Sequence, residues 1–262
     1  MSNYKRTRGL ISLPGMLNEA ECEAVDFLRE YEPPEGYQLS FSGGKDSIVM
    51  RHLADLAGVK YKALFNCTTI DPPQIYSFIR KHYPDTTWHY PKENFFKLVE
   101  KNGPAWRKVR WCCRLLKESG DIPGFMHILI GIRSEESAAR AKRKRIQPDI
   151  KGTGKTYYAP IHKWKEWQIW EHIERYSLPY PSLYDNGFNR VGCKICPLTF
   201  GISRPAMSRL QKAKSLYPHF IAHFEASLKR WFLNVGVKNE KNKGISFERW
   251  LDYYYRGFQG ER

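Results

Sequence analysis

The hexapeptide SGGKDS at residues 42–47 combines backbone freedom, hydroxyl groups and charge in a way that suits a phosphate. The apolar run YQLSF precedes it and the periodic run DSIVMRHLADLAG follows, which predicts a strand, a turn and a helix. In that order, the first N–H groups of the helix and the positive end of its dipole meet at the turn. Its residues are Ser42, Gly43, Gly44, Lys45, Asp46 and Ser47. Glycines allow close approach, serines add donors and the lysine adds charge, so we expect the turn to hold pyrophosphate or sulfate oxygens.

The six cysteines include two close pairs. Cys112 and Cys113 are adjacent in RWCCRLLKE, and Cys193 and Cys196 form a C-x-x-C in GCKICP. Four thiolates suit a 4Fe-4S cluster or a structural zinc ion. Adjacent cysteines favour the cluster, because a cluster spreads its ligands over separate irons. Zinc and buried free thiols remain the alternatives.

The segment GIRSEESAAR, residues 131–140, follows the apolar run HILI. It presents Gly131, Arg133 and Arg140 where a strand would end, and ligands bind at the carboxyl ends of strands in open parallel sheets. Arginine suits phosphate or sulfate because its guanidinium is planar and permanently charged. Alone, the segment also fits exposed charges at the start of a helix. Beside SGGKDS it predicts a second part of the same site.

The elements that must position these residues alternate between strands and helices. Strands are predicted at 37–41, 59–67, 86–91, 127–133 and 157–161, and helices at 18–31, 46–58, 72–83 and 165–176. This order predicts an α/β class with a doubly wound, mostly parallel sheet. Residues 140–156 carry charge, Pro and Gly without periodicity and predict a mobile basic loop, whereas 209–236 predict helix.

The net charge of +16 is unevenly distributed along the chain. Residues 101–165 carry 16 basic and 5 acidic side chains, and residues 201–262 carry 12 and 5, while the other two stretches are nearly neutral. A nucleic-acid partner explains such clusters, although a basic protein with a nucleotide pocket would also show them. No apolar run approaches a membrane span, and the N-terminus lacks the apolar core of a signal peptide. We expect a cytoplasmic protein with reduced cysteines and no membrane partner.

SGGKDS, RWCC-x-x-x-K, GIRSEESAAR and the tract at 158–197 together resemble the phosphoadenosine phosphosulfate (PAPS) reductase family. This family belongs to the PP-loop ATP pyrophosphatase, or adenine nucleotide α-hydrolase, superfamily. The resemblance covers roughly residues 36–200 and implies a nucleotide-binding domain there, between a helical lead-in at 1–35 and a basic, aromatic, helical region at 201–262. It implies that the hexapeptide binds the nucleotide together with Gly131, Arg133 and Arg140. It also implies that the four paired cysteines ligate a 4Fe-4S cluster.

One departure from the reductases affects the expected chemistry. They resemble one another in a C-terminal cysteine that attacks the sulfate sulfur, and no cysteine follows Cys196 here. The DNA phosphorothioation ATP pyrophosphatases resemble this pattern more closely in logic, with a PP-loop and cluster cysteines. That resemblance implies ATP and Mg²⁺ as cofactors, with Lys45, Asp46 and Arg133 as the catalytic residues.

The expected function is therefore adenylation of a nucleic acid for sulfur insertion, as in DNA phosphorothioation, with a cysteine desulfurase or another protein as the sulfur donor. Three alternatives stay open. They are a tRNA thiolation enzyme, a sulfonucleotide reductase whose nucleophile comes from a partner, and a nucleotide-binding regulatory subunit whose cluster senses redox state.

Overall fold

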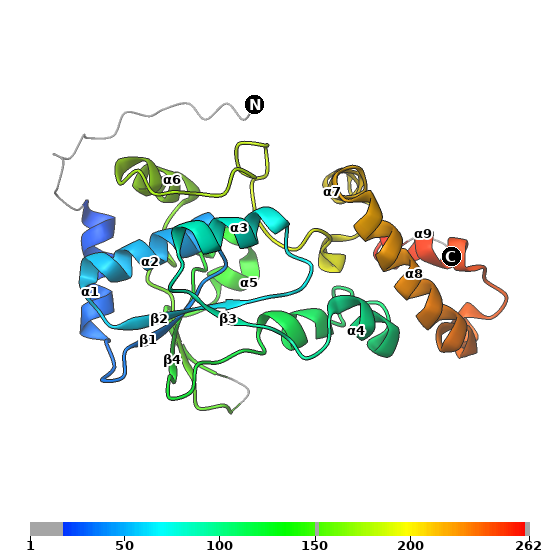
Figure 1. Ribbon diagram of the computed structural model, residues 1–262, viewed down its shortest axis with the longest axis horizontal. Helices are drawn as coiled ribbons and strands as arrows, with labels where there is room; N and C mark the ends of the chain where they lie inside the picture. Colours follow the sequence, from blue (N-terminus) through cyan, green and yellow to red (C-terminus); the bar gives the residue numbers. More distant parts are fainter. Residues whose placement is uncertain (1–17, 150–151, 260–262) are drawn as a thin grey trace. The chain divides into compact units, whose positions relative to one another are not determined.

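The computed structural model describes residues 18–149 and 152–259. Parts of the predicted lead-in at 1–35, of the basic loop at 140–156 and of the C-terminal region therefore lie outside the described residues. The chain forms two compact units, each assembled from separate stretches (Figure 1). The first unit takes its described residues from Met1–Phe65, Pro73–His89 and Asp121–Val191. The second takes them from Asn66–Pro72, Tyr90–Gly120 and Gly192–Arg262.

Both units draw on the range 36–200, because two of the second unit's stretches fall inside it. Within the described ranges, no helix is long and apolar enough to cross a membrane.

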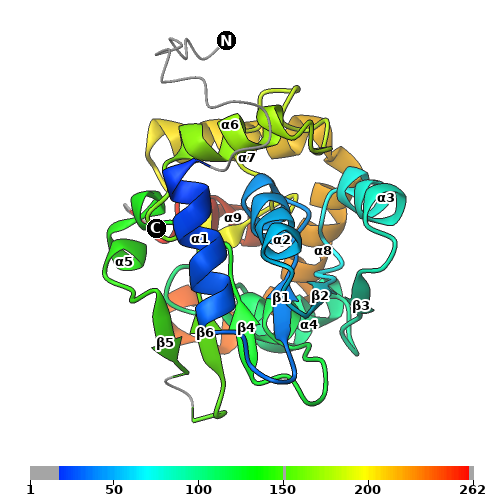
Figure 2. The ribbon, with the colours of Figure 1, turned by 90° about the vertical axis from the view of Figure 1, so that its left-hand side faces the viewer.

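The first unit is built on a six-stranded sheet with the strand order β3-β2-β1-β4-β6-β5 (Figure 2). The strands are β1 (Tyr37–Ser40), β2 (Tyr61–Asn66), β3 (Thr87–His89), β4 (His127–Leu129), β5 (Ile146–Pro148) and β6 (Thr156–Tyr158). β1 pairs in parallel with β2 and β4, β4 pairs in parallel with β6, and β5 runs antiparallel to β6. The predicted class, an α/β fold with a mostly parallel sheet, is confirmed.

The order of the strands creates a switch point between β1 and β4. After β1 the chain moves outward to β2 and β3, and then returns to β4 on the other side of β1. Leu39 of β1 lies between Ala63 and Leu129 in the register, and all three are buried. The carboxyl ends of β1 and β4 therefore adjoin, which is where doubly wound sheets bind ligands.

Helices of the first unit follow the local signals in the sequence. They are α1 (Glu19–Glu30), α2 (Lys45–Ala57), α3 (Pro73–His82), α5 (Ala138–Ala141) and α6 (Glu166–Arg175), with a 3₁₀ turn, η2, at Ser134–Glu136. Asn18 and Glu21 form a capping box at the start of α1, and Gly58 ends α2 in the left-handed conformation with φ +68°. α1 and α2 lie side by side in Figure 2 and are in contact.

The prediction of a structureless loop at 140–156 is wrong in part. α5 extends into its start, and Ile146–Pro148 form β5, whose backbone pairs with β6. β5 is the last strand of the sheet and ends in Pro148, a residue that edge strands tolerate because one side of the strand needs no ladder partner. Three residues are too few to show alternation in the sequence, so pairing with β6 decides the conformation.

The second unit is helical in its described residues. It contains α4 (Phe95–Asn102), α7 (Arg204–Leu216), α8 (Pro218–Asn234) and α9 (Phe247–Tyr255), the π-helical turn η1 (Cys113–Lys117), and the 3₁₀ turns η3 (Pro197–Thr199), η4 (Gly236–Lys238) and η5 (Glu240–Asn242). The helix predicted at 209–236 is two helices, because Pro218 cannot donate the N–H that would continue α7 and instead begins α8. α4 packs along α8 in a core rich in aromatic rings, including Phe95, Phe224 and Tyr254.

Candidate functional site

The turn between β1 and α2 directs backbone N–H groups into the switch point. Gly44 is the N-cap of α2, and no side chain caps the helix at this residue. Gly43 has φ +69°, and a Cβ there would lie 3.0 Å from side-chain carbons of Ile79. Any other residue at position 43 would be strained twice, by its conformation and by this contact. The first N–H groups of α2 are therefore available to polar groups from outside the helix.

Two hydroxyl groups brace the same turn. The Ser47 Oγ donates to the carbonyl of Gly44 at 2.8 Å and accepts from the N–H of Ser42 at 3.2 Å. The Oγ atoms of Ser42 and Ser47 are 3.2 Å apart. Ser47 is buried and holds the turn closed, whereas Ser42 is exposed and can reach a ligand.

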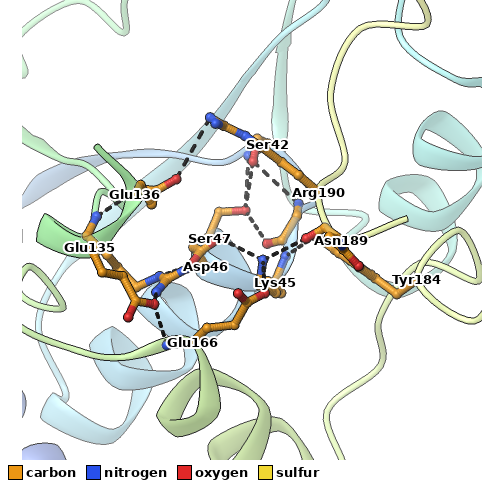
Figure 3. A network of polar contacts seen from close by, with 12 residues as sticks. Ser42, Lys45, Asp46, Ser47, Glu135, Glu136, Glu166, Tyr184, Asn189 and Arg190 are labelled. Carbon is orange, nitrogen blue, oxygen red and sulfur yellow. Dashed lines mark hydrogen bonds and ion pairs between the residues drawn. The ribbon is translucent and has the colours of Figure 1, made fainter. Parts of the chain in front are cut away.

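Lys45 is held at the turn instead of extending into solvent, since its side chain is only 4% exposed. Its Nζ lies 3.3 Å from Glu166, 3.7 Å from Asp46 and 3.1 Å from the carbonyl oxygen of Asn189 (Figure 3). The ammonium group also lies 5.5 Å from the ring centre of Tyr184. Two carboxylates thus neutralise this cation in the absence of a ligand.

Arg133, beyond the end of β4, meets the start of α2. Its Nε lies 2.6 Å from an oxygen of Asp46, and its Nη1 forms an ion pair with Glu135. Burial alone would lower the pKa of Arg133, but Asp46 and Glu135 outweigh burial and raise it. Arg133 therefore carries a permanent charge beside Asp46.

Gly131 explains how the two segments come so close. A Cβ at this position would lie 3.3 Å from the carbonyl carbon and oxygen of Asp46 and 3.4 Å from the N–H nitrogen of Ser47. Any side chain there would press on the first turn of α2. The glycine therefore sets the close approach between the end of β4 and the helix start.

Arg140 belongs to the outer part of the same network. It forms an ion pair with Glu136, which also accepts from the backbone N–H of Arg133 at 2.9 Å and lies 3.9 Å from Arg190. Burial would raise the pKa of Glu136, but these positive groups and the backbone bond lower it. Arg140 thus reaches the turn through Glu136 and Arg133.

The structure brings the predicted nucleotide-side residues into one network of the first unit. They are Ser42, Gly43, Gly44, Lys45, Asp46, Ser47, Gly131 and Arg133, with Arg140 joined through Glu136. Sequence reasoning did not single out Glu166, Tyr184 or Asn189, which contact Lys45 from far along the chain. The one signal for them was their position in the family-like tract at 158–197.

The four paired cysteines all belong to the second unit. Cys112 directly precedes the π-helical turn η1, which starts at Cys113. Cys196 is the N-cap of the turn η3. The loop before it is held by a hydrogen bond from the N–H of Lys194 to the carbonyl of Ile70 at 2.8 Å. No disulfide bond joins any cysteines in the described residues.

These thiols influence one another electrostatically. Hydrogen bonding to Cys113, burial and repulsion from Cys193 and Cys196 raise the pKa of Cys112. The Cys112 thiol in turn lowers the pKa of Cys113 to about 6, with further help from Arg110 and Lys117. Burial raises the pKa of Cys193 to about 11.

The donor set fits the iron–sulfur cluster in its chemistry. Four thiols that act on one another gather in one unit, and Cys112 and Cys193 pack against its apolar core, which limits access of water. Among the described residues, no group of three or more His, Cys, Asp or Glu is arranged so that it could hold a metal ion. Four thiolates suit a 4Fe-4S cluster or a structural zinc ion by their chemistry.

Comparison with known proteins places the chain in a class and then in a family. The fold defines a class, that of α/β proteins with a doubly wound, mostly parallel sheet. Residues 36–199 match the phosphoadenosine phosphosulfate reductase domain, and the chain belongs to that family.

Three relatives illustrate the match. The uncharacterized protein MJ0066 of Methanocaldococcus jannaschii is 29% identical over 234 residues, which cover 83% of this chain and 47% of that protein. The adenosine 5′-phosphosulfate reductase of Bacillus cereus is 28% identical over 187 residues, covering 66% of this chain and 77% of the reductase. A phosphate complex of the PAPS reductase of Candida auris superposes with a TM-score of 0.51 at 21% identity, covering 71% and 98%. The chain spans about half the length of the first curated relatives it matches.

Proposed function

We propose that the protein is an ATP pyrophosphatase that adenylates a nucleic acid and so prepares it for sulfur insertion, as in DNA phosphorothioation. The proposal is carried by the convergence of Lys45, Arg133 and the first turn of α2 at the switch point of the sheet. Two buried cations beside the positive end of a helix suit the several charges of a triphosphate.

In the proposed reaction, an oxygen of the acceptor attacks the α-phosphorus of ATP. A new P–O bond forms as the bond from the α-phosphorus to the bridging oxygen of the β-phosphate breaks, so pyrophosphate leaves; an ionised phosphodiester oxygen or a carbonyl oxygen carries no proton, and none is released. A persulfide donor, supplied by a cysteine desulfurase or a similar partner, then attacks the activated atom, so that a bond to sulfur forms and AMP leaves, and a thiol reductant cleaves the remaining S–S bond. The negative charge grows on the leaving pyrophosphate, where Lys45 and the N–H groups of α2 would stabilise it.

A nucleotide that binds at the turn meets cations that already have carboxylate partners. Lys45 and Arg133 are each paired with carboxylates, namely Asp46, Glu135 and Glu166. These carboxylates hold the two cations in place before a ligand binds. On binding, phosphate oxygens would replace part of these interactions. Such preorganisation reduces the cost of ordering them during the reaction.

Asp46 is the carboxylate that fits a role in holding Mg²⁺. Mg²⁺ is held in such sites by one or two carboxylates together with substrate phosphates and water, so a cage of protein ligands is not required. The Asp46 side chain is 21% exposed and lies beside Lys45, where the phosphates would bind. When bound, the ion would neutralise charge on the leaving pyrophosphate.

Exposed basic side chains support a nucleic-acid acceptor. Lys142, Arg143 and Lys144 follow α5, are exposed, and form no ion pair with a carboxylate of the described chain. Arg143 and Lys144 also line a small cavity beyond the end of β4. The second unit adds exposed basic residues on α7, including Arg204 and Arg209. A polyanion would gain affinity at such residues by releasing counterions.

In this proposal, the cluster is held by Cys112, Cys113, Cys193 and Cys196 in the second unit. When bound, it would supply a centre that carries sulfur or electrons. The chain's own contribution is the aromatic core that shields the thiols and the positive charge of Arg110 and Lys117 beside Cys113.

A second candidate, reduction of a sulfonucleotide, is favoured by the likeness to the Bacillus cereus reductase. The same turn would then hold the phosphosulfate group, and the nucleophilic thiol would come from a partner, because no cysteine follows Cys196 in this sequence. Both candidates use the same residues to bind the nucleotide and differ in the product.

Turnover by protein purified without oxygen separates the two. ATP, adenylyl sulfate and PAPS would each be supplied with Mg²⁺, with and without DNA or tRNA, while pyrophosphate, AMP and sulfite are followed. We expect pyrophosphate from ATP, stimulated by one of the nucleic acids. Sulfite from a sulfonucleotide with an added thiol, and no pyrophosphate from ATP, would overturn the proposal in favour of the reductase.

A further inference from the structure

Tyr184 reaches the anion site from a segment that the nucleotide motifs do not include. It lies beyond α6, in a compact turn in which its N–H donates to Pro181 and its carbonyl accepts from Gly187. Its hydroxyl oxygen accepts from the backbone N–H of Lys45, the first residue of α2, at 3.0 Å. A residue 139 positions along the chain thus contacts the helix start that the hexapeptide forms.

The ring of Tyr184 is fixed on two sides. Trp170 of α6 meets it edge to face at 5.1 Å between ring centres, and the ammonium group of Lys45 lies 5.5 Å from its centre. These contacts leave the phenol little rotational freedom. Its hydroxyl is therefore held in position at the helix start before any ligand binds.

The hydrogen bonds of this hydroxyl leave its proton unused. The N–H of Lys45 donates to the hydroxyl oxygen at 3.0 Å, so the oxygen is the acceptor in this bond and its hydrogen is not used in it. Within the described residues, no acceptor takes the hydroxyl hydrogen. Burial raises the pKa of Tyr184 to about 12, so the group keeps its proton at neutral pH.

Gly44 leaves a small space next to this hydroxyl because it has no side chain. A Cβ built on Gly44 would lie 3.4 Å from the Tyr184 hydroxyl and 3.4 Å from the Ser42 Oγ. Two hydroxyl groups therefore face one small space above the N-cap glycine, beside the first N–H of α2. An oxygen of a phosphate is the kind of acceptor that this space suits.

We propose that Tyr184 is a ligand-binding residue whose hydroxyl donates a hydrogen bond to a phosphate oxygen of the nucleotide, together with Ser42 across Gly44. The inference rests on the proposed use of the turn as the pyrophosphate site. It deepens that proposal by naming a donor from outside the PP-loop. Because the group is neutral, it recognises an oxygen by geometry and adds no charge to the site.

The test compares Tyr184→Phe with Tyr180→Phe, whose hydroxyl bonds the exposed Asp185. Pyrophosphate and adenosine are titrated separately by calorimetry on the full chain. We expect Tyr184→Phe to weaken pyrophosphate binding about tenfold or more, as for a hydrogen bond to a charged group, with adenosine affinity unchanged. Tyr180→Phe should leave both affinities unchanged. An unchanged pyrophosphate affinity, or an equal loss for both ligands, overturns the proposal, because the second result marks a structural role alone.

Gly44→Ala gives a second measurement that remains decisive if Tyr184→Phe folds poorly. The added methyl meets both hydroxyls at ordinary contact distance, so the chain should keep its melting temperature while the space is filled. We expect a loss of pyrophosphate affinity of about tenfold or more, and no further loss when Tyr184→Phe is added. Additive losses, or an unchanged affinity in Gly44→Ala, would overturn the proposal. Release of pyrophosphate from ATP is read separately, so pyrophosphate binding without turnover would contradict the proposed function and leave Tyr184 in its role.

Discussion

The two units differ in the ionisable groups that they bring together and in the partners of those groups. In the first unit, the two cations of the turn are paired with three carboxylates: Lys45 with Glu166 and Asp46, and Arg133 with Asp46 and Glu135. In the second unit, four thiols act on one another, and the charged groups that act on them include Arg110, Lys117 and Asp71.

This difference indicates what each site needs from a ligand. Matched cations hold their positions without a nucleotide, so the first unit should fold and bind phosphate on its own interactions. Thiolates gathered in a poorly hydrated place repel one another, and a bound metal centre would remove that repulsion. We therefore expect metal removal to lower the stability of the second unit and to leave nucleotide binding in the first unit largely intact.

The largest expected effect comes from Cys112→Ser. Loss of one ligand should remove the cluster, so iron and acid-labile sulfide should fall to background and the brown colour should disappear. Cys22→Ser changes an exposed cysteine of the first unit and should keep full iron content. Metal analysis and the visible spectrum of protein prepared without oxygen provide the measurement. A colourless wild type with stoichiometric zinc would disprove the cluster.

The next effect is that of Lys45→Ala on turnover. The substitution removes the buried cation nearest to the proposed leaving group, so the rate of pyrophosphate release should fall by about 10²–10³-fold. Iron content should stay at the wild-type value, since Lys45 belongs to the other unit. Lys81→Ala, an exposed lysine of α3, is the matched control and should keep its rate. A Lys45→Ala variant with full activity would exclude a role for this cation in the reaction.

Much of the first unit could be predicted from the sequence because its signals are local. The capping box at Asn18 and Glu21, the left-handed Gly58 and the strand before SGGKDS each depend on a few neighbouring residues. The second unit was harder to predict. The helix α4 was missed, although Asn94 caps it and Phe95, Leu98 and Val99 form its buried face, because an eight-residue helix gives a weak periodic signal.

In the candidate site too, residues with local sequence signals could be predicted, whereas contacts between distant segments could not. Types and spacing identified Lys45, Arg133 and the glycines, because each lies beside a strand end. They could not identify Glu166 or Tyr184 as partners of Lys45, since those contacts depend on how α6 and the following turn pack. Nor could spacing alone show that Gly131 faces Asp46, a contact that only the paired strands create.

A third prediction concerns a buried network that joins α1, α2 and α6 in the first unit. Glu21 and His172 are 0% and 1% exposed, with 2.6 Å between a Glu21 oxygen and the His172 Nδ1. His52 Nδ1 lies 2.8 Å from His172 Nε2, and Arg175 lies 3.1 Å from the other Glu21 oxygen. Burial would raise the pKa of Glu21, but its hydrogen bonds and these positive partners lower it. Burial and His172 lower the pKa of His52.

Both shifts have the same consequence for stability. The unfolded chain binds these protons at higher pH than the folded chain, so stability is fully present above the unfolded pKa values and is lost as pH falls through them. We expect the free energy of unfolding of the first unit to fall as pH drops below about 7, where His52 binds a proton in the unfolded chain, and to fall further below about pH 4, where Glu21 does. Glu21→Gln should cost about 3 kcal/mol at neutral pH and flatten the part of the decline below about pH 4. Asp26→Asn, an exposed position on α1, should do neither. Urea titrations at several pH values measure both effects, and an unchanged slope in Glu21→Gln would exclude the network as the cause.

The smallest expected effect is a loss of nucleic-acid affinity on removal of exposed basic side chains, and it tests which unit binds the nucleic acid. Replacing Lys142, Arg143 and Lys144 by alanine removes three exposed charges of the first unit. If each contacts a phosphate, affinity at physiological salt should fall about 10- to 100-fold, and the slope of log affinity against log salt should decrease by about 2–3.

Matched alanine substitutions at Arg204, Arg209 and Lys238 remove three exposed charges of the second unit. A change in slope with one triple variant alone assigns the contact to that unit, and equal changes assign it to both. If neither variant changes the slope for DNA or tRNA, the clustered charge serves another purpose, and a small-molecule acceptor would then account better for the matched cations of the turn.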